Sequence, residues 1–493
     1  MIFHIENNGY AISVPLSEQT SGESIYSMTS GYENLDRISI DGTNYFESVL
    51  AFNKAIDRAR KGKGPTVIES SVVRLLPHSS SDDHRKYRSE EEIENDKLRD
   101  PIEQFKILCI DKGIIKDREF DKLKKQIKDT VDQDAIWAES QDNPKPSSSL
   151  LNIYSDKKIS YTQNTETSDK IVLVDAINHA LQEELSFNDK LILYGQDIAG
   201  GKGGVFTATR GLTDKFGKDR VFNSPLAESS IIGTAIGLST LGYKPVIEIQ
   251  FGDYIWTSMM QIRNELATMR YRSNGDWSCP VVMRVPVGGY IHGSLCHSQS
   301  IEGYFTHLPG IRIAYPSNAA DAKGLLKSAC RMDDPILFLE HKGLYRQGYA
   351  SSNEPSEKYL LEFGKANIIQ QGDDITIVTW GALVQKSIEA SKNTSFSVEI
   401  IDMRTLNPLD FECIIKSIKK TSRLIVAHED NLTGGFGAEI VSRISDSAFE
   451  YLDAPVKRVG SKDSPIAYAQ NLEDEILVQV DWIVDCLNEV GNY

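Results

Sequence analysis

The feature that most constrains the fold of this chain is a regular alternation of helical and strand patterns that begins near residue 171. Short apolar runs of strand length are separated by longer segments with helical periodicity. The predicted strands are KLILYG (190–195), KPVIEIQ (244–250) and PVVMRVP (280–286), and the predicted helices are IVLVDAINHALQEEL (171–185), residues 226–241 and TSMMQIRNELATMRYR (257–272). This alternation is typical of a parallel, doubly wound α/β sheet.

A second α/β unit begins near residue 365. Its predicted strands are DITIVTWG (374–381), SVEIIDMR (397–404) and RLIVAHE (423–429), and its last predicted helix covers 473–490. The stretch 141–170 is rich in Pro, Ser, Asn and Thr, and it is interpreted as an interdomain linker. We therefore expect domains at 1–140, 171–350 and 365–493, since a chain of 493 residues is too long for one core.

The N-terminal third has a mixed pattern. IFHIE (2–6) looks like a buried strand, residues 44–62 like an amphipathic helix and residues 65–77 like a second buried strand. The polar stretch 78–100 is interpreted either as a functional surface loop or as a solvated charge run. Residues 101–140 are expected to be helical.

Composition limits the classes of partner. The net charge of −16 argues against nucleic acid and anionic membranes as main partners. The six cysteines include no CxxC pair, which favours free thiols in a reducing compartment over disulfides or a zinc site. There is no apolar run long enough to span a membrane and no signal-peptide pattern, so we expect a cytoplasmic protein.

The stretch NSPLAESSIIGTAIG (223–237) is the strongest candidate for chemistry, because it places one acid, Glu228, among small and apolar residues at a helix start. Glu228 either interacts with the helix dipole or is a buried carboxylate with a raised pKa that can carry a proton. His297 follows a strand and a glycine-rich turn, where open α/β sheets place ligands, although a lone histidine is more often structural. The glycine-rich loop 197–206 fits neither a dinucleotide motif nor a P-loop.

Longer motifs carry a family resemblance. GKDRVFNSPLAESSIIGTAIG, VIEIQFGDYIW, RYRSNGDW, GSLCHSQS, PSNAADAKGLL and LTGGFGAEI, within about 168–490, resemble the β subunit of the thiamin-diphosphate-dependent decarboxylating component of 2-oxo acid dehydrogenase complexes. IENNGYAISVP, HSSSDDHRKYR and DPIEQF, within 1–140, resemble the C-terminal half of the α subunit of that component. The chain therefore resembles an α–β fusion, and GSLCHSQS and HSSSDD favour the branched-chain (2-oxoisovalerate) type.

The resemblance implies an α/β thiamin-diphosphate-binding fold with doubly wound parallel sheets. Its parts are a partial pyrophosphate-binding domain, a pyrimidine-binding domain and a transketolase C-terminal-like domain. It further implies that the cofactor stabilises the carbanion while the protein positions and polarises it. Glu228 would hydrogen-bond the aminopyrimidine ring, and Tyr254 and Gln250 would line the pocket of that ring.

The histidines receive separate roles from the same resemblance. His297 would orient the reaction intermediate, and His78 would take part in reductive acylation of the lipoyl group. Both roles suit a side chain that gains or loses a proton near neutral pH. Arg74 would support the loop after His78, and Ser79 is expected to be an unmodified loop residue.

Two cation sites are also implied. Asn8 and the carbonyl of Tyr10 match two Mg²⁺ ligands, but the GDG motif that completes this site in the family is absent from the sequence. We therefore expect a truncated α-type domain, with incomplete binding of Mg²⁺ and diphosphate by this polypeptide alone. A K⁺ site would lie around Ala329, Met332 and Asp334, largely through backbone oxygens.

The primary hypothesis is oxidative decarboxylation of a branched-chain 2-oxo acid, the reaction of a 3-methyl-2-oxobutanoate dehydrogenase. The acyl group would pass to lipoyllysine of the dihydrolipoyl acyltransferase, whose lipoyl domain and core are the expected partners. The alternatives are a pyruvate or acetoin dehydrogenase component and a non-catalytic assembly subunit. The family pattern also implies a two-fold oligomer.

Overall fold

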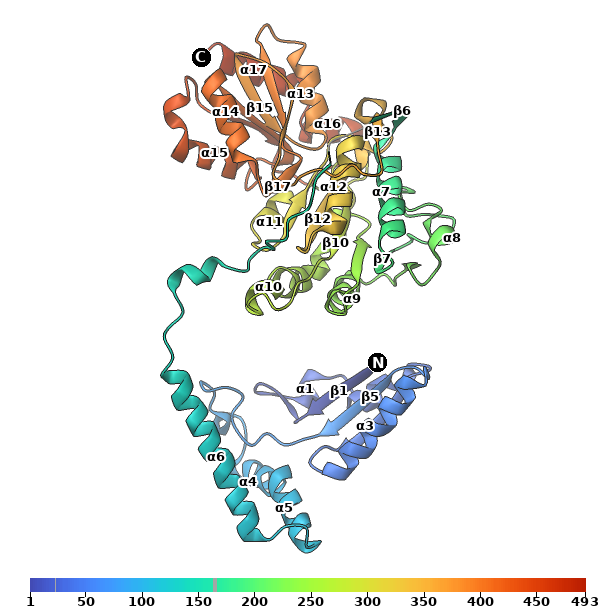
Figure 1. The fold of residues 1–493 in the computed structure, drawn as a ribbon, viewed down its shortest axis with the longest axis vertical. Coiled ribbons are helices and arrows are strands. Elements are labelled where there is room, and N and C mark those ends of the chain that lie inside the picture. Colours follow the sequence, from blue (N-terminus) through green and yellow to red (C-terminus); the bar gives the residue numbers. More distant parts are fainter. Residues whose placement is uncertain (23, 163–165) are drawn as a thin grey trace. The chain divides into compact units, whose positions relative to one another are not determined.

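The computed structural model describes residues 1–22, 24–162 and 166–493, in two compact units, Met1–Pro144 and Lys145–Tyr493. Both units have the mixed helix and strand content that the sequence predicts (Figure 1). None of the helices in the described ranges is long and apolar enough to cross a lipid bilayer.

The first unit is built on a parallel three-stranded sheet with the order β1 (Ile2–Asn7), β5 (Thr66–Ser71) and β4 (Asp36–Asp41). Helix α3 (Tyr45–Arg60) packs on this sheet, and its N-terminus is capped by the Asn44 side chain, which accepts hydrogen bonds from the Phe46 and Glu47 amides. The prediction that IFHIE is buried is wrong, because β1 is an edge strand whose Phe3 is 47% exposed.

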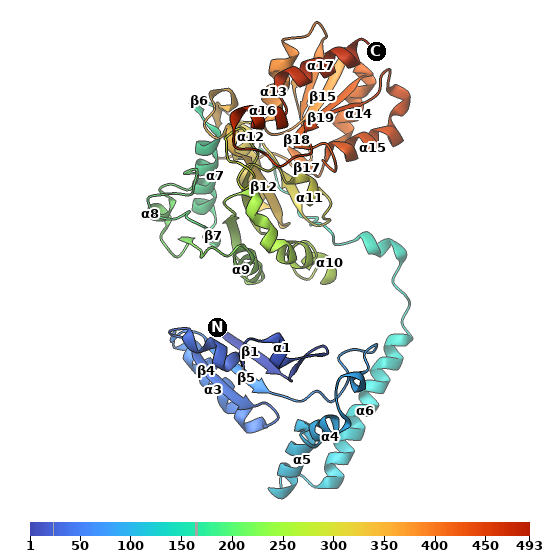
Figure 2. The same cartoon turned by 180° about the vertical axis from the view of Figure 1, so that it is seen from behind.

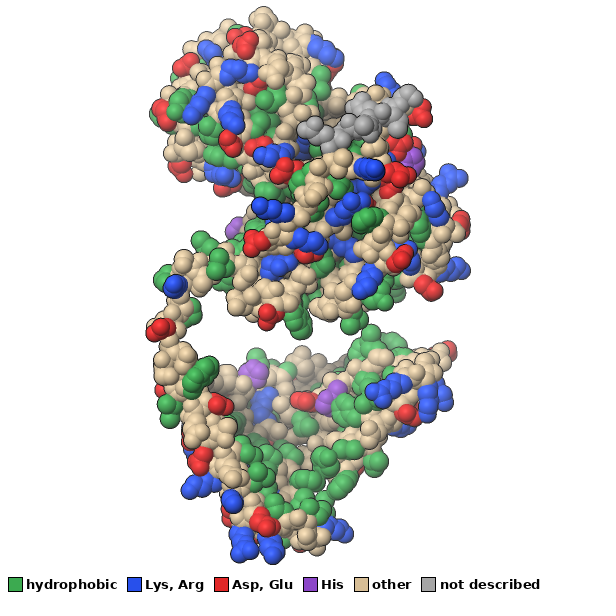
Figure 3. Space-filling model, in the orientation of Figure 1, with side chains coloured by type: hydrophobic (Ala, Val, Ile, Leu, Met, Phe, Trp, Pro, Cys, Tyr) green, Lys and Arg blue, Asp and Glu red, His purple; other side chains and the backbone are tan. Residues whose placement is uncertain are grey.

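The remaining elements of the first unit are short, apart from one long helix. They are β2 (Tyr10–Ala11), β3 (Val14–Pro15), α1 (Leu16–Gln19), α2 (Ile25–Met28), α4 (Glu90–Leu98), α5 (Pro101–Asp111) and α6 (Asp117–Glu139). Helix α6 buries none of its residues, and apolar side chains show on the visible face of this unit (Figure 3).

The polar stretch 78–100 is only partly a loop, because α4 occupies its second half. Ser89 caps α4 by accepting a hydrogen bond from the Glu92 amide at 3.1 Å, and Ile93 is buried. Three acidic residues in the first turn add a favourable interaction with the helix dipole. The charged stretch therefore contains a capped helix, which the high polarity of the sequence made difficult to predict.

The second unit contains a seven-stranded sheet in which six strands are parallel. Its order is β17 (Thr405–Asn407), β11 (Arg312–Ala314), β12 (Ile336–His341), β10 (Val282–Val287), β9 (Lys244–Glu248), β7 (Leu191–Gly195) and β8 (Val221–Asn223). Strand β17 is antiparallel to β11 and belongs to the C-terminal part of the chain. This strand joins the two α/β parts of the unit.

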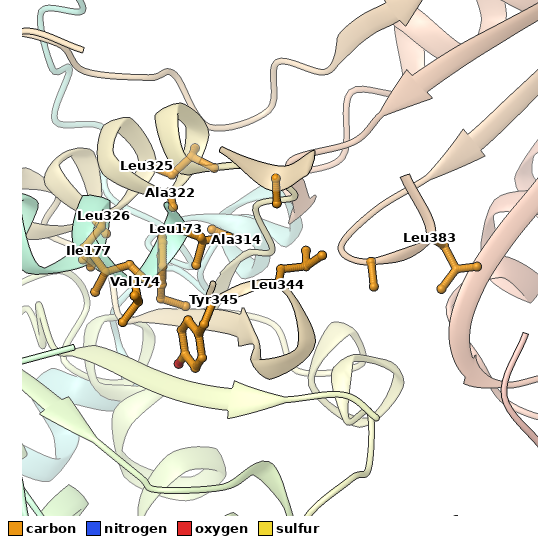
Figure 4. Close-up of a cluster of buried hydrophobic side chains, with 14 of the residues drawn as sticks. Leu173, Val174, Ile177, Ala314, Ala322, Leu325, Leu326, Leu344, Tyr345 and Leu383 are labelled. Atoms are coloured by element: carbon orange, nitrogen blue, oxygen red, sulfur yellow. The ribbon is translucent and has the colours of Figure 1, made fainter. Parts of the chain in front are cut away.

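Alternate residues of the central strands enter different layers of core, so both faces of the sheet are covered. Leu191 and Leu193 pack with helices α7 (Leu173–Phe187) and α12 (Ala319–Arg331), whereas Ile192 and Tyr194 pack with α9 (Glu228–Thr240). Figure 4 shows the α7–α12 layer, with Leu173 and Ile177 facing Leu326. The doubly wound expectation is confirmed for this sheet.

The C-terminal part has a five-stranded sheet with helices on both faces (Figures 1 and 2). Its order is β14 (Asn367–Gln370), β16 (Val398–Asp402), β15 (Ile375–Thr379), β18 (Leu424–Asn431) and β19 (Lys457–Ser461), and β14 alone is antiparallel. Helices α13 (Leu383–Ser391) and α17 (Val480–Gly491) cover one face, and α14 (Phe411–Thr421) and α15 (Gly437–Ser447) cover the other.

Two predicted helices are interrupted. Residues 257–272 form the end of a 3-10 turn (Gly252–Ser258), a π-helical turn (Gln261–Leu266) and α10 (Met269–Arg272). Residues 473–490 divide into α16 (Gln470–Ile476) and α17, because Leu477 and Val478 leave the helix, are buried, and contact Gly289 and Tyr290 in the loop after β10.

The predicted linker 141–170 carries structure over much of its length. The amide of Ser155 donates to Asp334 at 2.7 Å, and Lys157 pairs with Asp333 at 2.9 Å. Strand β6 (Glu166–Ile171) pairs with β13 (Ser352–Pro355). Residues 163–165 of the predicted linker lie outside the described residues.

Candidate functional site

The candidate site of the second unit lies at the carboxyl ends of its parallel strands. Gln196 directly follows β7, Gln250 lies two residues beyond β9, and the loop with His297 follows β10. Glu228 is the first residue of α9, which follows β8. Open α/β sheets bind ligands at this edge, because the loops of neighbouring strands converge there.

The Glu228 carboxylate is held by two side chains from other elements. Its Oε1 accepts a hydrogen bond from the Gln196 amide at 2.9 Å, and its Oε2 lies 3.4 Å from the Thr257 hydroxyl. The side chain is half-buried, and the role of Glu228 stays a prediction. Because Glu228 also starts α9, the helix dipole favours its charge as well.

Tyr254 and His297 form a hydrogen-bonded pair beside Glu228. The His297 Nδ1 lies 3.1 Å from the Gly293 carbonyl, which can only accept, so Nδ1 carries the proton in this geometry. The Nε2 atom is then free to accept a hydrogen bond from the Tyr254 hydroxyl at 2.7 Å. Burial raises the pKa of Tyr254, and the nearby acidic groups, Glu228 among them, raise it further.

Phe251 supplies an aromatic wall to this pair. Its ring centroid lies 4.7 Å from that of His297 and 5.4 Å from that of Tyr254, both in edge-to-face geometry. The ring centroid of Phe206, a residue of the glycine-rich loop, lies 5.7 Å from that of Phe251. A flat apolar surface therefore lies next to a carboxylate and an oriented imidazole.

Gln250 is buried, but its amide points to the glycine-rich loop. It donates to the Asp197 carboxylate at 3.1 Å and to the Gln196 carbonyl at 3.3 Å. Gln250 thus fixes the backbone on which Gln196 stands. Its direct role in lining a cofactor pocket stays a prediction.

Sequence reasoning missed Gln196 and Lys342. Lys342 directly follows β12, and its buried ammonium lies 5.6 Å from the Phe251 ring. Burial lowers the pKa of Lys342 to about 7, against the opposing charges of Asp253 and Glu429. Both residues occupy the position directly after a parallel strand, which is the signal that could have identified them.

The predicted site residues of the first unit form a separate network. Arg74 is buried, and its guanidinium donates to the carbonyls of Tyr10 at 3.2 Å and Ile12 at 2.5 Å. Arg74 and Arg88 also lie 5.5 and 5.6 Å from the Tyr10 ring centroid. Arg88 is paired with Glu92 and Asp96.

His78 is exposed at the beginning of its loop. Its amide donates to Asp82 at 3.0 Å, and the same carboxylate oxygen accepts from the Tyr87 hydroxyl at 2.6 Å. Tyr87 in turn lies 3.3 Å from the Arg74 guanidinium. Arg74 is therefore connected to the backbone of His78, while the imidazole itself extends into solvent.

The described part of the first unit does not assemble a full Mg²⁺ ligand set. The Tyr10 carbonyl already accepts from a guanidinium, and the Asn8 side-chain oxygen accepts from the Tyr10 amide at 3.1 Å. Among the described residues, no group of three or more His, Cys, Asp or Glu side chains could hold a metal ion. Two engaged oxygens do not meet the octahedral preference of Mg²⁺.

Two of the three residues of the predicted K⁺ site already have N–H partners in the chain. The buried Lys244 ammonium donates to the Met332 carbonyl at 2.8 Å. Asp334 accepts from the Arg312 guanidinium at 2.5 Å and from the Ser155 amide. The Met332 carbonyl and the Asp334 carboxylate are thus already engaged, and the K⁺ site stays a prediction.

Three family models match the chain. They are described as "Dehydrogenase E1 component" over residues 1–147, "Transketolase, pyrimidine binding domain" over 169–347 and "Transketolase, C-terminal domain" over 364–483. A solved chain titled "Split gene transketolase, inactive beta4 tetramer" superposes with a TM-score of 0.52 at 24% identity, covering 65% of this chain and 98% of that chain. The fold is therefore transketolase-like, as predicted: a pyrimidine-binding domain followed by a transketolase C-terminal domain.

Two curated relatives identify the family within the transketolase-like proteins. The 2-oxoisovalerate dehydrogenase subunit beta of Bacillus subtilis is 42% identical over 324 residues, which cover 65% of this chain and 98% of the relative. The pyruvate dehydrogenase E1 component subunit beta of the same organism is 43% identical over 304 residues, which cover 61% of this chain and 93% of the relative. The chain belongs to the family of thiamin-diphosphate-dependent 2-oxo acid dehydrogenase E1 components, with an α-like N-terminal domain and a β-like remainder.

Proposed function

We propose that this chain, as an α–β fusion, takes part in the oxidative decarboxylation of a branched-chain 2-oxo acid. The acyl product passes to lipoyllysine of a dihydrolipoyl acyltransferase, whose lipoyl domain and core are its partners, and the chain works as a two-fold oligomer. The observation that carries the proposal is the grouping of Glu228, Tyr254 and His297 at the carboxyl edge of the seven-stranded sheet.

The residues present fit the aminopyrimidine half of thiamin diphosphate. The Glu228 carboxylate is a hydrogen-bond acceptor held at Oε1 by Gln196, and its Oε2 has only the distant Thr257 hydroxyl. Beside it, Tyr254 and Phe251 give an aromatic ring a surface on which to stack. When bound, the cofactor supplies the group that stabilises the carbanion formed on loss of CO₂.

The chain's own residues then hold and move protons at defined atoms. Glu228 would hold a proton at its carboxyl group and share it with the aminopyrimidine ring of the bound cofactor. His297 keeps its proton on Nδ1 through the Gly293 carbonyl, and its Nε2 accepts from the Tyr254 hydroxyl, so this pair would orient the bound substrate. His78, exposed on its loop, serves the later transfer to the lipoyl group.

The branched-chain substrate is supported by the motifs GSLCHSQS and HSSSDD. The relatives named for 2-oxoisovalerate and for pyruvate are 42% and 43% identical, so the choice between substrates rests on those motifs and on experiment. A hydrophobic pocket discriminates between substrates that differ by one methylene group by about 10–200-fold in kcat/KM. We expect kcat/KM with 2-oxoisovalerate to exceed that with pyruvate by about tenfold or more.

The test measures turnover of both acids by the purified full chain with an artificial electron acceptor. Thiamin diphosphate and Mg²⁺ are supplied at saturating concentrations, because weak cofactor binding is expected. Preference for pyruvate would instead favour the pyruvate dehydrogenase alternative. Reconstitution with lipoyl domain and acyltransferase core then tests the partners, and sedimentation tests the oligomer.

A second candidate is a non-catalytic assembly subunit. It is favoured by one observation, the incomplete set of Mg²⁺ ligands around Asn8 and Tyr10. Without an organised anchor for the diphosphate, the aromatic pocket alone should bind the cofactor weakly. Titration calorimetry separates the candidates, because micromolar Mg²⁺-dependent binding of thiamin diphosphate to the chain alone would exclude the assembly subunit.

A further inference from the structure

The loop that carries His297 has an unusual backbone. After β10, every second residue takes a left-handed conformation: Gly288 at φ 84°, Tyr290 at 59°, His292 at 56° and Ser294 at 62°. Glycine adopts this region freely, but bulky side chains rarely do. Three of the four residues are not glycine, so the loop needs contacts from outside to keep this shape.

Those contacts come from the last turn of α16 and the two residues that follow this helix. The Glu473 carboxylate lies 2.8 Å from the His292 Nδ1 and accepts the His292 amide with both oxygens at 3.3 Å. Two residues before His292, the Tyr290 hydroxyl donates to the Val478 carbonyl at 2.9 Å. Both of these left-handed residues are therefore held by one short segment, 473–478, which we name the anchor segment.

The start of the loop is held by the same part of the chain. A Cβ on Gly289 would lie 2.5 Å from the Leu477 side chain, so the backbone approaches the anchor segment as closely as a glycine permits. The Gly289 amide also donates to Glu429 at 2.6 Å. These contacts explain why Leu477 and Val478 leave the helix that the sequence predicts.

The buried carboxylate of Glu473 makes its contacts with this loop. Its side chain is 1% exposed, and burying a carboxylate is costly unless it is hydrogen-bonded. In the described part of the chain, the hydrogen bonds to the Glu473 side chain come from His292 alone. A residue needed only to fold α16 would not require a charge at this position.

The path from Glu473 to His297 is short. Gly293 directly follows His292, and its carbonyl accepts the hydrogen bond from His297 Nδ1 that orients the imidazole. A Cβ on Gly293 would lie 3.0 Å from the His297 Cβ, so the two residues are in close contact. A shift of His292 would therefore move the hydrogen-bond acceptor of His297.

We infer that Glu473, acting through His292, is a positioning residue of the C-terminal domain that sets the place of His297 in the active site. This inference rests on the proposed function for its kinetic consequence, but its structural consequence is measurable without turnover. It gives the C-terminal domain a role in the chemistry performed at the carboxyl edge of the other sheet.

The experiment compares Glu473→Ala, His292→Ala and His292→Asn in the full chain. Hydrogen exchange of the loop 288–300 should rise about tenfold in both alanine variants, because the loop loses its anchor. Misplacement of a catalytic group by about 1 Å costs up to about 100-fold, so kcat should fall at least about tenfold while KM changes little. His292→Asn should recover most of both losses, since an Asn amide lies near the Nδ1 position and tolerates a left-handed φ.

A matched control is available on α7. His179 also places Nδ1 close to a glutamate, Glu354, at 2.7 Å, and its side chain is 42% exposed compared with 48% for His292. His179→Ala should leave loop exchange and kcat unchanged within about twofold, because its pair lies outside the loop. Glu473→Gln, which keeps one acceptor and the side-chain volume, serves if Glu473→Ala does not fold.

Unchanged exchange of loop 288–300 in folded Glu473→Ala or Glu473→Gln would overturn the inference. A fall in kcat without a change in loop exchange would overturn it too. If the wild-type chain shows no turnover, the proposed function fails, and the exchange measurement still decides whether Glu473 positions the loop. Restored exchange but not turnover in His292→Asn would assign His292 a direct part in the chemistry, against the inference.

Discussion

The ammonium of Lys244 lies 2.8 Å from the carbonyl oxygen of Met332. Lys244 begins β9, and Met332 follows the last turn of α12, so this contact ties a sheet strand to a helix C-terminus. Burial lowers the pKa of Lys244 to about 8. The Lys244 ammonium thus contacts one of the carbonyls that the family resemblance implies as a K⁺ ligand.

The first prediction concerns that contact. Replacing K⁺ by Na⁺ at constant ionic strength should leave the melting temperature unchanged, because the carbonyl is already satisfied. Lys244→Met should lower the unfolding free energy by about 1–3 kcal/mol, since the Met332 carbonyl loses its donor. Calorimetric melts in both salts check this, and a rise of several degrees in K⁺ alone would show a bound ion.

The second prediction concerns Glu228. Glu228→Gln should abolish decarboxylation of 2-oxoisovalerate, because an amide cannot relay the proton to the cofactor ring. The amide oxygen can still accept from Gln196, so the melting temperature and circular dichroism should change little. Near-normal turnover of the variant would instead favour the alternative interpretation, in which Glu228 only interacts with the helix dipole.

The third prediction separates two half-reactions. His78 is exposed, and its backbone rather than its imidazole is tied to Asp82. His78→Ala should therefore keep a substantial rate with an artificial electron acceptor, while transfer to a lipoyl domain falls by about 100-fold or more, within the usual range for a lost acid–base group. Equal loss in both assays would mean that His78 holds the loop or the cofactor.

The fourth prediction is a pH dependence of stability at Glu302, a residue of α11 (Glu302–Thr306). Glu302 is fully buried, accepts from the Trp380 indole at 3.0 Å, and burial raises its pKa to about 8, with the Asp430 charge adding to the effect. The folded state therefore holds a proton that the unfolded state releases above its ordinary pKa of 4.5. This stabilisation is complete below that ordinary pKa and is lost as pH rises through about 8.

Glu302→Gln should remove this loss, because the amide is neutral at every pH and retains the acceptor for Trp380. The unfolding free energy of the variant, relative to that of the wild type, should rise by up to about 1.4 kcal/mol per pH unit between about pH 5 and 8. Melting curves recorded at each pH measure this difference. Glu439, exposed on α15, provides the matched control as Glu439→Gln. Parallel melting curves for wild type and Glu302→Gln would show that Glu302 is ionised in the folded protein.

Much of the local structure was predictable from the pattern of residues. The strands at 190–195, 244–250 and 280–286 appear as β7, β9 and β10, and helix 44–62 appears as α3. Apolar periodicity predicts these elements because each buries a face or is buried on both sides. The errors fall where a segment leaves its periodic structure to make a distant contact, as Leu477 and Val478 do.

The sequence by itself determined the alternation that makes the sheets parallel, the motifs of the family, and Glu228, Tyr254 and His297 as candidates. Only the tertiary structure decided which side chains meet: Gln196 with Glu228, Lys244 with Met332, and His292 with Glu473 across 181 positions. Periodicity is a property of neighbouring residues, whereas these contacts depend on loops and helix ends that meet only in the folded protein. Their hydrogen bonds form only after distant segments have packed, and so no local pattern contains them.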